Sequence, residues 1–207
     1  MGKIDEKKRQ KKAALLESAY QLFTEKGIEE TSVSEIVGNA HLAKGTFYLY
    51  FKDKYQVRDV LIARQSNLLF ERADVKLKES FLIEEARKSL EECVIFIVDH
   101  ILDYLNENPV LLRFISKNLS WAIFSDLRIE GVYNQKSIDF FNALIEQSDK
   151  KYRQRKLMIY MILELVNATC YNVILHHSPV GLDELKKDLY EAIRNLMRQF
   201  ECKQEET

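Results

Sequence analysis

The sequence predicts an all-α fold with about nine helices, in which a three-helix helix-turn-helix domain precedes a larger helical domain. Three observations lead to this prediction. Only 6 Gly and 2 Pro occur in 207 residues, which favours long helices joined by short loops. Apolar residues recur at helical spacings, and no run alternates with period two for the length of a strand. We place the domain boundary between residues 54 and 55.

Composition narrows the class of protein. With 46% apolar and 30% charged residues, the chain is globular rather than disordered. The net charge is −1, but residues 1–54 hold 10 basic and 8 acidic side chains, which gives a mildly basic N-terminal part. The three cysteines are far apart and form no CxxC pair, so we expect neither a zinc cluster nor disulfides. We therefore expect a cytoplasmic protein without metal, cofactor, secretory signal or membrane span.

The first helix is expected over residues 11–26. Its apolar side chains form one stripe, and Gly27 follows at the position where glycine commonly ends a helix. Six basic residues lie within the first 12. This segment is either an arm that reaches DNA or the frayed start of the helix, and we favour the second interpretation.

A second helix is expected from Thr31-Ser32 to about Ala40, because a hydroxyl cap is followed by the acid Glu35. A turn at residues 41–43 leads to a third helix over 44–50, and Asp53 caps a fourth. Asn108-Pro109 signals another helix start. The helices after the third are expected at about 55–74, 83–105, 109 onward, 121–124, 133–147, 151–177 and 182–202.

Residues 31–54 carry the most informative pattern, TSVSEIVGNAHLAKGTFYLYFKDK. A helix, a tight turn and a short second helix allow the second helix to enter the major groove of DNA. Phe47 and Phe51 are four residues apart and face the domain core. The opposite face carries side chains that reach phosphates and base edges, namely Lys44, Thr46, Tyr48 and Tyr50. Gly45 lets the backbone approach DNA closely.

This pattern resembles the TetR family of bacterial transcriptional regulators. The matching positions are Ala19, Leu22, Phe23, Gly27, Thr31, Val33, Ile36, Ala40, Lys44 to Tyr48, Tyr50, Phe51 and Lys54, across about a quarter of the chain. The resemblance implies that Lys44, Gly45 and Thr46 meet base edges. It also implies phosphate contacts from Thr31, Tyr48, Tyr50 and Lys54.

Two positions depart from the family pattern. His41 stands in the turn where glycine is usual, and it is strained if the backbone there is left-handed. Ala43 replaces a Ser or Thr that would cap the recognition helix. Both departures concern the detailed DNA contacts rather than the assignment.

The last two predicted helices carry continuous apolar stripes, which the resemblance assigns to a homodimer interface. The stripes consist of Met158, Ile162, Leu165, Leu185, Leu189, Ile193, Leu196 and Phe200. A dimer would place two recognition helices about one DNA turn apart. The alternative is that these residues form the core of a monomer.

The middle helices are rich in aromatic residues with polar groups nearby, a composition typical of small-molecule pockets. The candidates are Phe96, His100, Tyr104, Trp121, Phe124, Tyr133, Phe140, Asn167 and Tyr171. The resemblance implies that such a pocket binds an inducer, whereas ordinary core packing is the alternative for each residue.

Together these features predict a repressor that binds a palindromic operator as a homodimer and is released by a small-molecule ligand. Two alternatives stay open. One is a helical interaction module that has lost DNA binding, which the residues at 41 and 43 allow. The other is an all-helical enzyme, although the four histidines are not accompanied by a nucleophile or carboxylate pattern, a metal motif or a phosphate loop.

Overall fold

The structure is a computed structural model that describes residues 3–84, 88–116, 128–129, 132–133 and 135–202. It confirms the all-α fold, with nine helices in this part of the chain. The chain divides into two compact units, residues 1–64 and 65–207. This division lies within a long helix, ten residues after the functional boundary that we placed between residues 54 and 55.

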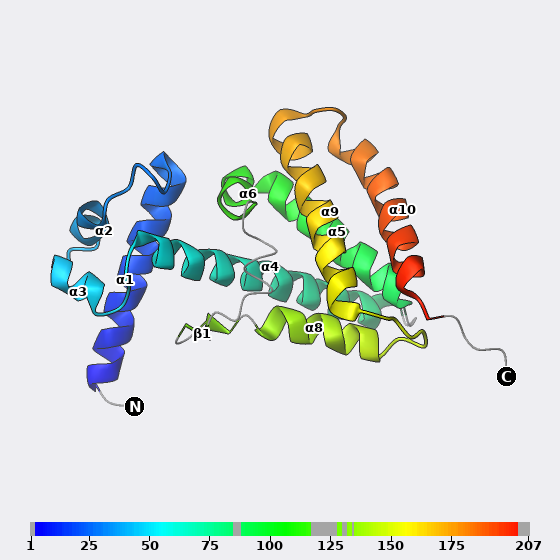
Figure 1. Cartoon of the computed structure of the whole chain (residues 1–207), viewed down its shortest axis with the longest axis horizontal. Helices are drawn as coiled ribbons and strands as arrows, with labels where there is room; N and C mark the ends of the chain where they lie inside the picture. The colour runs from blue at the N-terminus through cyan, green and yellow to red at the C-terminus, as the bar shows by residue number, and fades with distance from the viewer. Residues whose placement is uncertain (1–2, 85–87, 117–127, 130–131, 134, 203–207) are drawn as a thin grey trace. The chain divides into compact units, whose positions relative to one another are not determined.

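The N-terminal unit contains α1 (Lys3–Lys26), α2 (Val33–Asn39), α3 (Lys44–Tyr48) and the first part of α4 (Lys54–Glu84) (Figure 1). Side chains from all four helices meet in its core. Five of these side chains are at most 2% exposed: Leu15, Ile36, Phe47, Phe51 and Val57. Removing these apolar surfaces from water is the main stabilisation of the unit.

Local signals explain where these helices begin and end. Ser32 caps α2 in a capping box, since its side chain accepts a hydrogen bond from the Glu35 amide and the Glu35 carboxylate accepts from the Ser32 amide. Gly27 has a φ of 93°, as expected for the left-handed residue after a helix. Asp53 accepts a hydrogen bond from the Gln56 amide at 2.8 Å and so caps α4 as predicted.

Two helix boundaries in this region differ from the sequence prediction. Helix α1 begins at Lys3 rather than at residue 11, so the basic segment is helical and not an extended arm. Asp5 and Glu6 in the first turn favour this extension through the helix dipole. Helix α4 continues ten residues beyond Asp74, because Leu77 and Ser80 extend its buried face.

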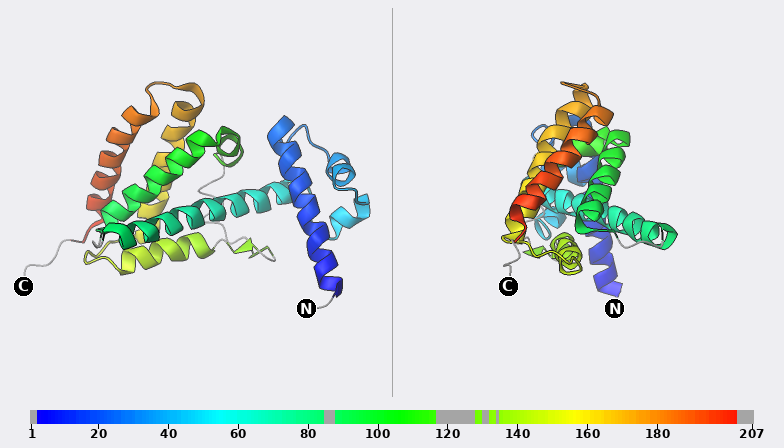
Figure 2. Two further views of the ribbon diagram at one scale, coloured as in Figure 1. Left: turned by 180° about the vertical axis from the view of Figure 1, so that it is seen from behind. Right: turned by 90° about the vertical axis from the view of Figure 1, so that its right-hand side faces the viewer.

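The larger unit contains the rest of α4 together with α5 (Leu90–Glu107), α6 (Pro109–Ile115), α8 (Gln135–Glu146), α9 (Arg155–His176) and α10 (Leu182–Phe200). Helices α9 and α10 lie side by side in all views, and α5 packs against both (Figures 1 and 2). The buried side chains of α5 recur at helical spacing and face this bundle, which makes α5 its central helix.

Two further predictions need correction, and a third is not tested. Helix α5 begins at Leu90, seven residues later than expected, because Ser89 and Glu92 form a capping box. Two-residue strands, β1 (Arg128–Ile129) and β2 (Val132–Tyr133), pair antiparallel although no strand was expected. The expected helix over 121–124 lies outside the described residues.

Helix α9 begins at Arg155 and not at residue 151, because the preceding residues pair with the chain after α10. The Arg153 amide donates to the Phe200 carbonyl at 2.9 Å, and the Cys202 amide donates to the Lys151 carbonyl at 2.8 Å. These two bonds form an antiparallel bridge at residues 152 and 201. The bridge ties the end of α10 to the start of α9.

Helix α9 is long and apolar enough, by length and composition alone, to cross a membrane. In the structure it packs against α5, α6 and α10, and its buried residues point into the bundle. We therefore interpret its apolar character as that of a core helix.

Candidate DNA-binding surface and core cavity

The outward face of α3 presents the predicted base-contacting and phosphate-contacting residues. Lys44, Gly45 and Tyr48 are exposed, with 55% of Tyr48 accessible, while Thr46 and Tyr50 are half-buried. These residues belong to one short helix and its end, so they form one continuous polar surface, which we call the α3 surface. Lysine, threonine and tyrosine side chains are suited to phosphate oxygens and base edges.

Aromatic packing holds α3 from behind. Phe47 and Phe51 are completely or almost completely buried, and their ring centroids are 5.7 Å apart. The Tyr48 ring meets Phe47 edge-to-face at 5.4 Å. Such contacts fix the orientation of the helix, so the α3 surface is presented rigidly.

The turn between α2 and α3 adopts the conformation expected to strain a side chain. His41 has a φ of 53°, in the left-handed region that disfavours most residues other than glycine. The Leu42 amide closes the turn by donating to the Val37 carbonyl at 2.9 Å. Ala43 provides no side-chain cap for α3, because alanine has no polar side-chain atom. Both departures from the family pattern are thus accommodated without loss of the helix-turn-helix.

Gly45 has no packing reason within the chain to be glycine. A Cβ atom built at this position would meet no other atom within 4 Å. Glycine inside a helix costs about 1 kcal/mol relative to alanine, so its presence needs another explanation. Close approach of an external molecule to the backbone is one.

Two of the predicted phosphate ligands have other roles in the structure. Thr31 is only 1% exposed, and its hydroxyl donates to the Gly27 carbonyl at 2.7 Å. The Lys54 ammonium donates to the carbonyls of Ile28 and Glu29, each at 2.8 Å. Both side chains therefore brace the loop between α1 and α2, and their phosphate contacts stay predictions.

Charge pairs also fix α2 against α1. The Lys26 ammonium and the Ser32 amide and hydroxyl lower the pKa of Glu35 from 4.5 to about 2. Tyr55 donates a hydrogen bond to the Glu29 carboxylate at 2.9 Å, which links the start of α4 to the same loop. Both contacts are exposed, so their effect on the folding free energy is small.

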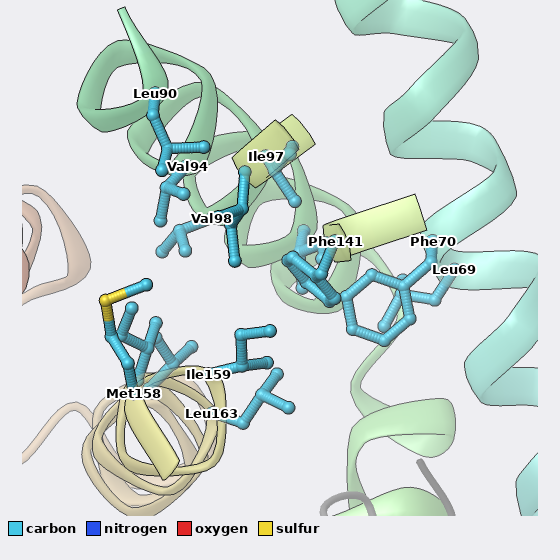
Figure 3. A pocket seen from close by; sticks show the side chains of 14 residues that line it. Leu69, Phe70, Leu90, Val94, Ile97, Val98, Phe141, Met158, Ile159 and Leu163 are labelled. Carbon is cyan, nitrogen blue, oxygen red and sulfur yellow. The ribbon is translucent and has the colours of Figure 1, made fainter. Parts of the chain in front are cut away.

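A small apolar cavity of about 40 Å³ lies inside the larger unit, among α4, α5, α8 and α9 (Figure 3). We call it the core cavity. Among the described residues, its lining consists of aliphatic, aromatic and thioether side chains: Leu69, Phe70, Leu90, Val94, Ile97, Val98, Ile101, Phe141, Ile145, Met158, Ile159, Ile162, Leu163 and Val166. Side chains of α5 and α9 point toward one another across it, and Phe70 contacts Phe141 edge-to-face at 5.3 Å.

Among the predicted pocket residues whose side chains the structure describes, none lines the core cavity. Phe96, His100, Tyr104, Phe140, Asn167 and Tyr171 are half-buried elsewhere in the larger unit, Tyr133 lies in β2 and Trp121 and Phe124 lie outside the described residues. Arg72 stacks on the Tyr104 ring at 4.9 Å, and the Asn167 amide donates to the Ser116 carbonyl at 2.6 Å. Tyr104 and Asn167 thus have contacts within the chain, and the pocket expected from the aromatic residues stays a prediction.

Five of the eight predicted interface residues are buried within the chain itself. Met158, Ile162, Leu189, Ile193 and Phe200 are at most 7% exposed, and the first two line the core cavity. In the single chain these five side chains therefore belong to the core, as the monomer alternative expects. Leu165, Leu185 and Leu196 are half-buried. The exposed apolar side chains of α9 are instead Leu157, Tyr160 and Met161.

Sequence reasoning missed the cavity residues and one residue beside the α3 surface. Leu49 directly follows Tyr48 and is 80% exposed. Its exposure is visible in the sequence pattern, because it lies between the inward positions 47 and 51. The residues of the core cavity gave no such signal, since any buried apolar residue looks the same in sequence.

The described residues contain no group of three histidine, cysteine or acidic side chains that could hold a metal ion. Cys93 and Cys170 are buried, and burial raises the pKa of the Cys170 thiol to about 12. Such a thiol is a poor nucleophile at neutral pH.

Comparison with known proteins agrees with the geometry of the N-terminal unit. Residues 15–60 match the family model of bacterial regulatory proteins of the tetR family. An HTH-type transcriptional regulator of Staphylococcus aureus (strain USA300) is 23% identical over 173 residues, which cover 84% of this chain and 86% of that protein. The transposon Tn10 TetC protein of Escherichia coli is 25% identical, with 79% of this chain and 78% of that protein covered.

Solved structures show the same fold over most of the chain. A tetR family transcription regulator from Shewanella sp. PV-4 has a TM-score of 0.62 and 21% identity, covering 93% of this chain and 99% of that one. The transcriptional regulator FadR from Bacillus subtilis, solved with stearoyl-CoA, has a TM-score of 0.58 and 18% identity, covering 87% and 96%.

Proposed function

The chain belongs to the TetR family of bacterial transcriptional regulators, and on this premise we propose that it is a repressor that binds a palindromic operator as a homodimer and leaves it when a small molecule binds. The observation that carries the proposal is the α3 surface. Lys44 and Tyr48 are exposed on it, while Phe47 and Phe51 anchor the helix from the opposite side. A cytoplasmic location fits a protein that acts on DNA.

Each residue of the α3 surface has a proposed role. Lys44, Gly45 and Thr46 stand at the start of α3 and meet base edges in the major groove. Tyr48 and Tyr50 donate to phosphates, and Leu49 supplies an apolar contact to a thymine methyl or a sugar. The other two predicted phosphate ligands, Thr31 and Lys54, act through the loop that they brace.

For the homodimer we propose the outward face of α9 and α10. Leu157, Tyr160 and Met161 expose between 39% and 45% of their surface on α9. Exposed apolar side chains grouped on one helix are typical of surfaces that bind a partner. The half-buried Leu165, Leu185 and Leu196 keep their predicted role at the edge of this face.

Sedimentation at micromolar concentration tests the dimer. The wild type is expected to sediment as a dimer, and Met161→Glu as a monomer, because a charge would be buried at the interface. Val110→Glu is the matched control, since Val110 is 49% exposed on α6. A monomeric wild type, or equal effects of the two variants, would contradict the proposed interface.

Release by a ligand requires a molecule that binds one conformation of the larger unit more tightly than another. The core cavity is the proposed place for it. The likeness to FadR, whose structure contains stearoyl-CoA, supports a ligand with a hydrophobic part, which agrees with the apolar lining.

Selection of bound DNA from a random pool tests the function as a whole. We expect a palindrome. Tyr48→Phe should weaken binding to all sequences alike, because it removes a phosphate contact, whereas Thr46→Ala should relax the preference at particular bases. Failure to retain any duplex at low salt would favour an interaction module that has lost DNA binding. Turnover of a substrate that survives removal of residues 1–54 would favour the enzyme.

A further inference from the structure

A second cavity lies beside the core cavity, where α5 begins and α8 ends. We call it the hollow; its volume is about 480 Å³. In contrast to the core cavity, it has a mixed lining of charged, polar and apolar side chains: Phe81, Lys88, Ser89, Leu90, Glu91, Glu92, Cys93, Leu144, Gln147, Ser148, Asp149, Lys150 and Tyr152. A volume of this size is in the range of small-molecule sites.

The wall between the two cavities is thin. Within the described part of the chain, Leu90 is the one residue that lines both of them, and it is 6% exposed. On either side, adjacent residues divide between the two spaces. On α5, Cys93 lines the hollow and Val94 lines the core cavity. On α8, Leu144 lines the hollow and Ile145 lines the core cavity. A rotation of the Leu90 side chain would therefore join the two spaces.

We propose that the core cavity and the hollow form one site for an uncharged amphiphile, whose hydrocarbon part lies in the core cavity and whose hydrogen-bonding end lies in the hollow. This inference rests on the proposed release by a ligand and names its chemical class. A polar group buried in the core cavity would find no partner among its apolar lining, so only hydrocarbon is stable there.

The charges of the hollow decide against an anionic end. The Lys150 ammonium already pairs with Glu91 and Glu201, each at 3.0 Å. The Glu92 carboxylate is bound by Ser89, and Asp149 adds a third negative charge to the lining. Among the described residues, two positive charges, those of Lys88 and Lys150, stand against these three. An added anion would face an excess of carboxylates, and an added cation would compete with Lys150 for its partners. A hydroxyl or amide end carries no charge, so it is not repelled by the carboxylates and does not compete with Lys150.

The core cavity must expand to admit such a molecule. At about 40 Å³ it is far smaller than the cavity of about 150 Å³ that binds benzene in an engineered protein. Leu90 on α5 and Met158 on α9 project into this space from opposite sides (Figure 3). An occupying chain would hold α5 and α9 further apart, and this difference gives the ligand a preference between conformations.

Titration calorimetry of the full chain without DNA tests the ligand class. The probes are straight-chain alcohols from hexanol to dodecanol, used below their aggregation limits, and decanoate. The affinity should rise about fourfold for each added methylene, the factor expected for burial in an apolar site. Decanol should bind more tightly than decanoate. An affinity that is independent of chain length, or tighter binding of decanoate, would overturn the proposal.

Two variants locate the parts of the molecule. Val98→Phe fills the core cavity and should lower the decanol affinity at least about tenfold, the loss expected when two methylenes are excluded. Val110→Phe, on the surface of α6, should leave it unchanged. If Val98→Phe does not fold, Val98→Leu replaces it with a smaller effect in the same direction. Asp149→Asn should narrow the difference in affinity between decanol and decanoate. An unchanged difference would mean that the polar end of the ligand does not lie in the hollow.

DNA binding by the same preparation separates the two proposals. Retention of the selected DNA together with failure to bind any alcohol overturns this inference and leaves the proposed function standing. Binding of alcohols with no retention of DNA overturns the proposed function instead.

Discussion

The two units place their functional side chains in opposite ways. The N-terminal unit exposes polar side chains on the outside of α3 and uses its apolar residues only to support them. The larger unit keeps its candidate site inside, among apolar side chains from four helices. The surface site depends on one helix and the turn before it, whereas the interior site depends on how distant helices pack. A local pattern can specify the first kind of site but not the second.

The largest expected effect tests the support of the α3 surface. Phe47→Ala should lower the free energy of unfolding by about 3–5 kcal/mol, because it leaves a cavity at a completely buried position. Urea denaturation measures this loss. Tyr48→Phe is the control on the outer side of the same helix and should change stability by less than about 0.5 kcal/mol. Similar stability losses in both variants would mean that α3 is not anchored as described.

The next effect separates a bracing lysine from a DNA-contacting one. Lys54→Met should lower the unfolding free energy by about 1.5–3 kcal/mol, since two carbonyls lose a charged donor, and leave the salt dependence of DNA binding unchanged. Lys44→Met should preserve stability and reduce the slope of log affinity against log salt by about 1. A reduced slope in Lys54→Met would restore its predicted phosphate contact.

Two serine N-caps, one in each unit, allow the effect of the same substitution to be compared between the units. Ser32 and Ser89 form the same capping box at the starts of α2 and α5. Replacing either with alanine should cost about 1 kcal/mol of stability, measured by thermal denaturation. Ser32→Ala should also weaken DNA binding, because α2 supports the α3 surface. Equal DNA affinities for the two variants would show that the cap of α2 has no part in binding.

The smallest effect concerns acid. The pKa of Glu35 is about 2 in the folded chain and 4.5 as the ordinary value, so its contacts stabilise the fold above pH 4.5 and are lost as pH falls toward 2. Glu35→Gln should remove this part of the acid dependence. Denaturation curves between pH 2 and pH 6, compared with the wild type, measure it. If the stability of the wild type and of the variant changes with pH in the same way, the contacts of the Glu35 carboxylate do not stabilise the fold.

The sequence predicted the helix-turn-helix well because its signals are local. Caps at residues 32 and 53, glycine at 27 and paired phenylalanines each act within one or two turns of helix. The predicted start of α1 was wrong because the acidic residues of its first turn were overlooked. The predicted start of α5 was wrong because its capping box was overlooked. The residues that tie α9 to α10 could not be recognised, since their partners lie about fifty positions away.

The interior was predicted less well for a physical reason. An apolar stripe shows which face of a helix is buried but not what covers it. From the sequence, Met158 and Ile162 were placed in the homodimer interface, whereas in the structure they line the core cavity. Aromatic residues with polar neighbours were assigned to a pocket, yet the described lining of the cavity consists of aliphatic residues, Met158 and two phenylalanines. Only the packing of α4, α5, α8 and α9 distinguishes these cases.

The central claim is that the α3 surface enters the major groove, and methylation protection of guanine N7 on the selected DNA tests it most directly. We predict protection at two half-sites about 10 base pairs apart, and its loss at the same guanines in Lys44→Met. Protection that is absent from the major groove, or unchanged in this variant, would contradict the account.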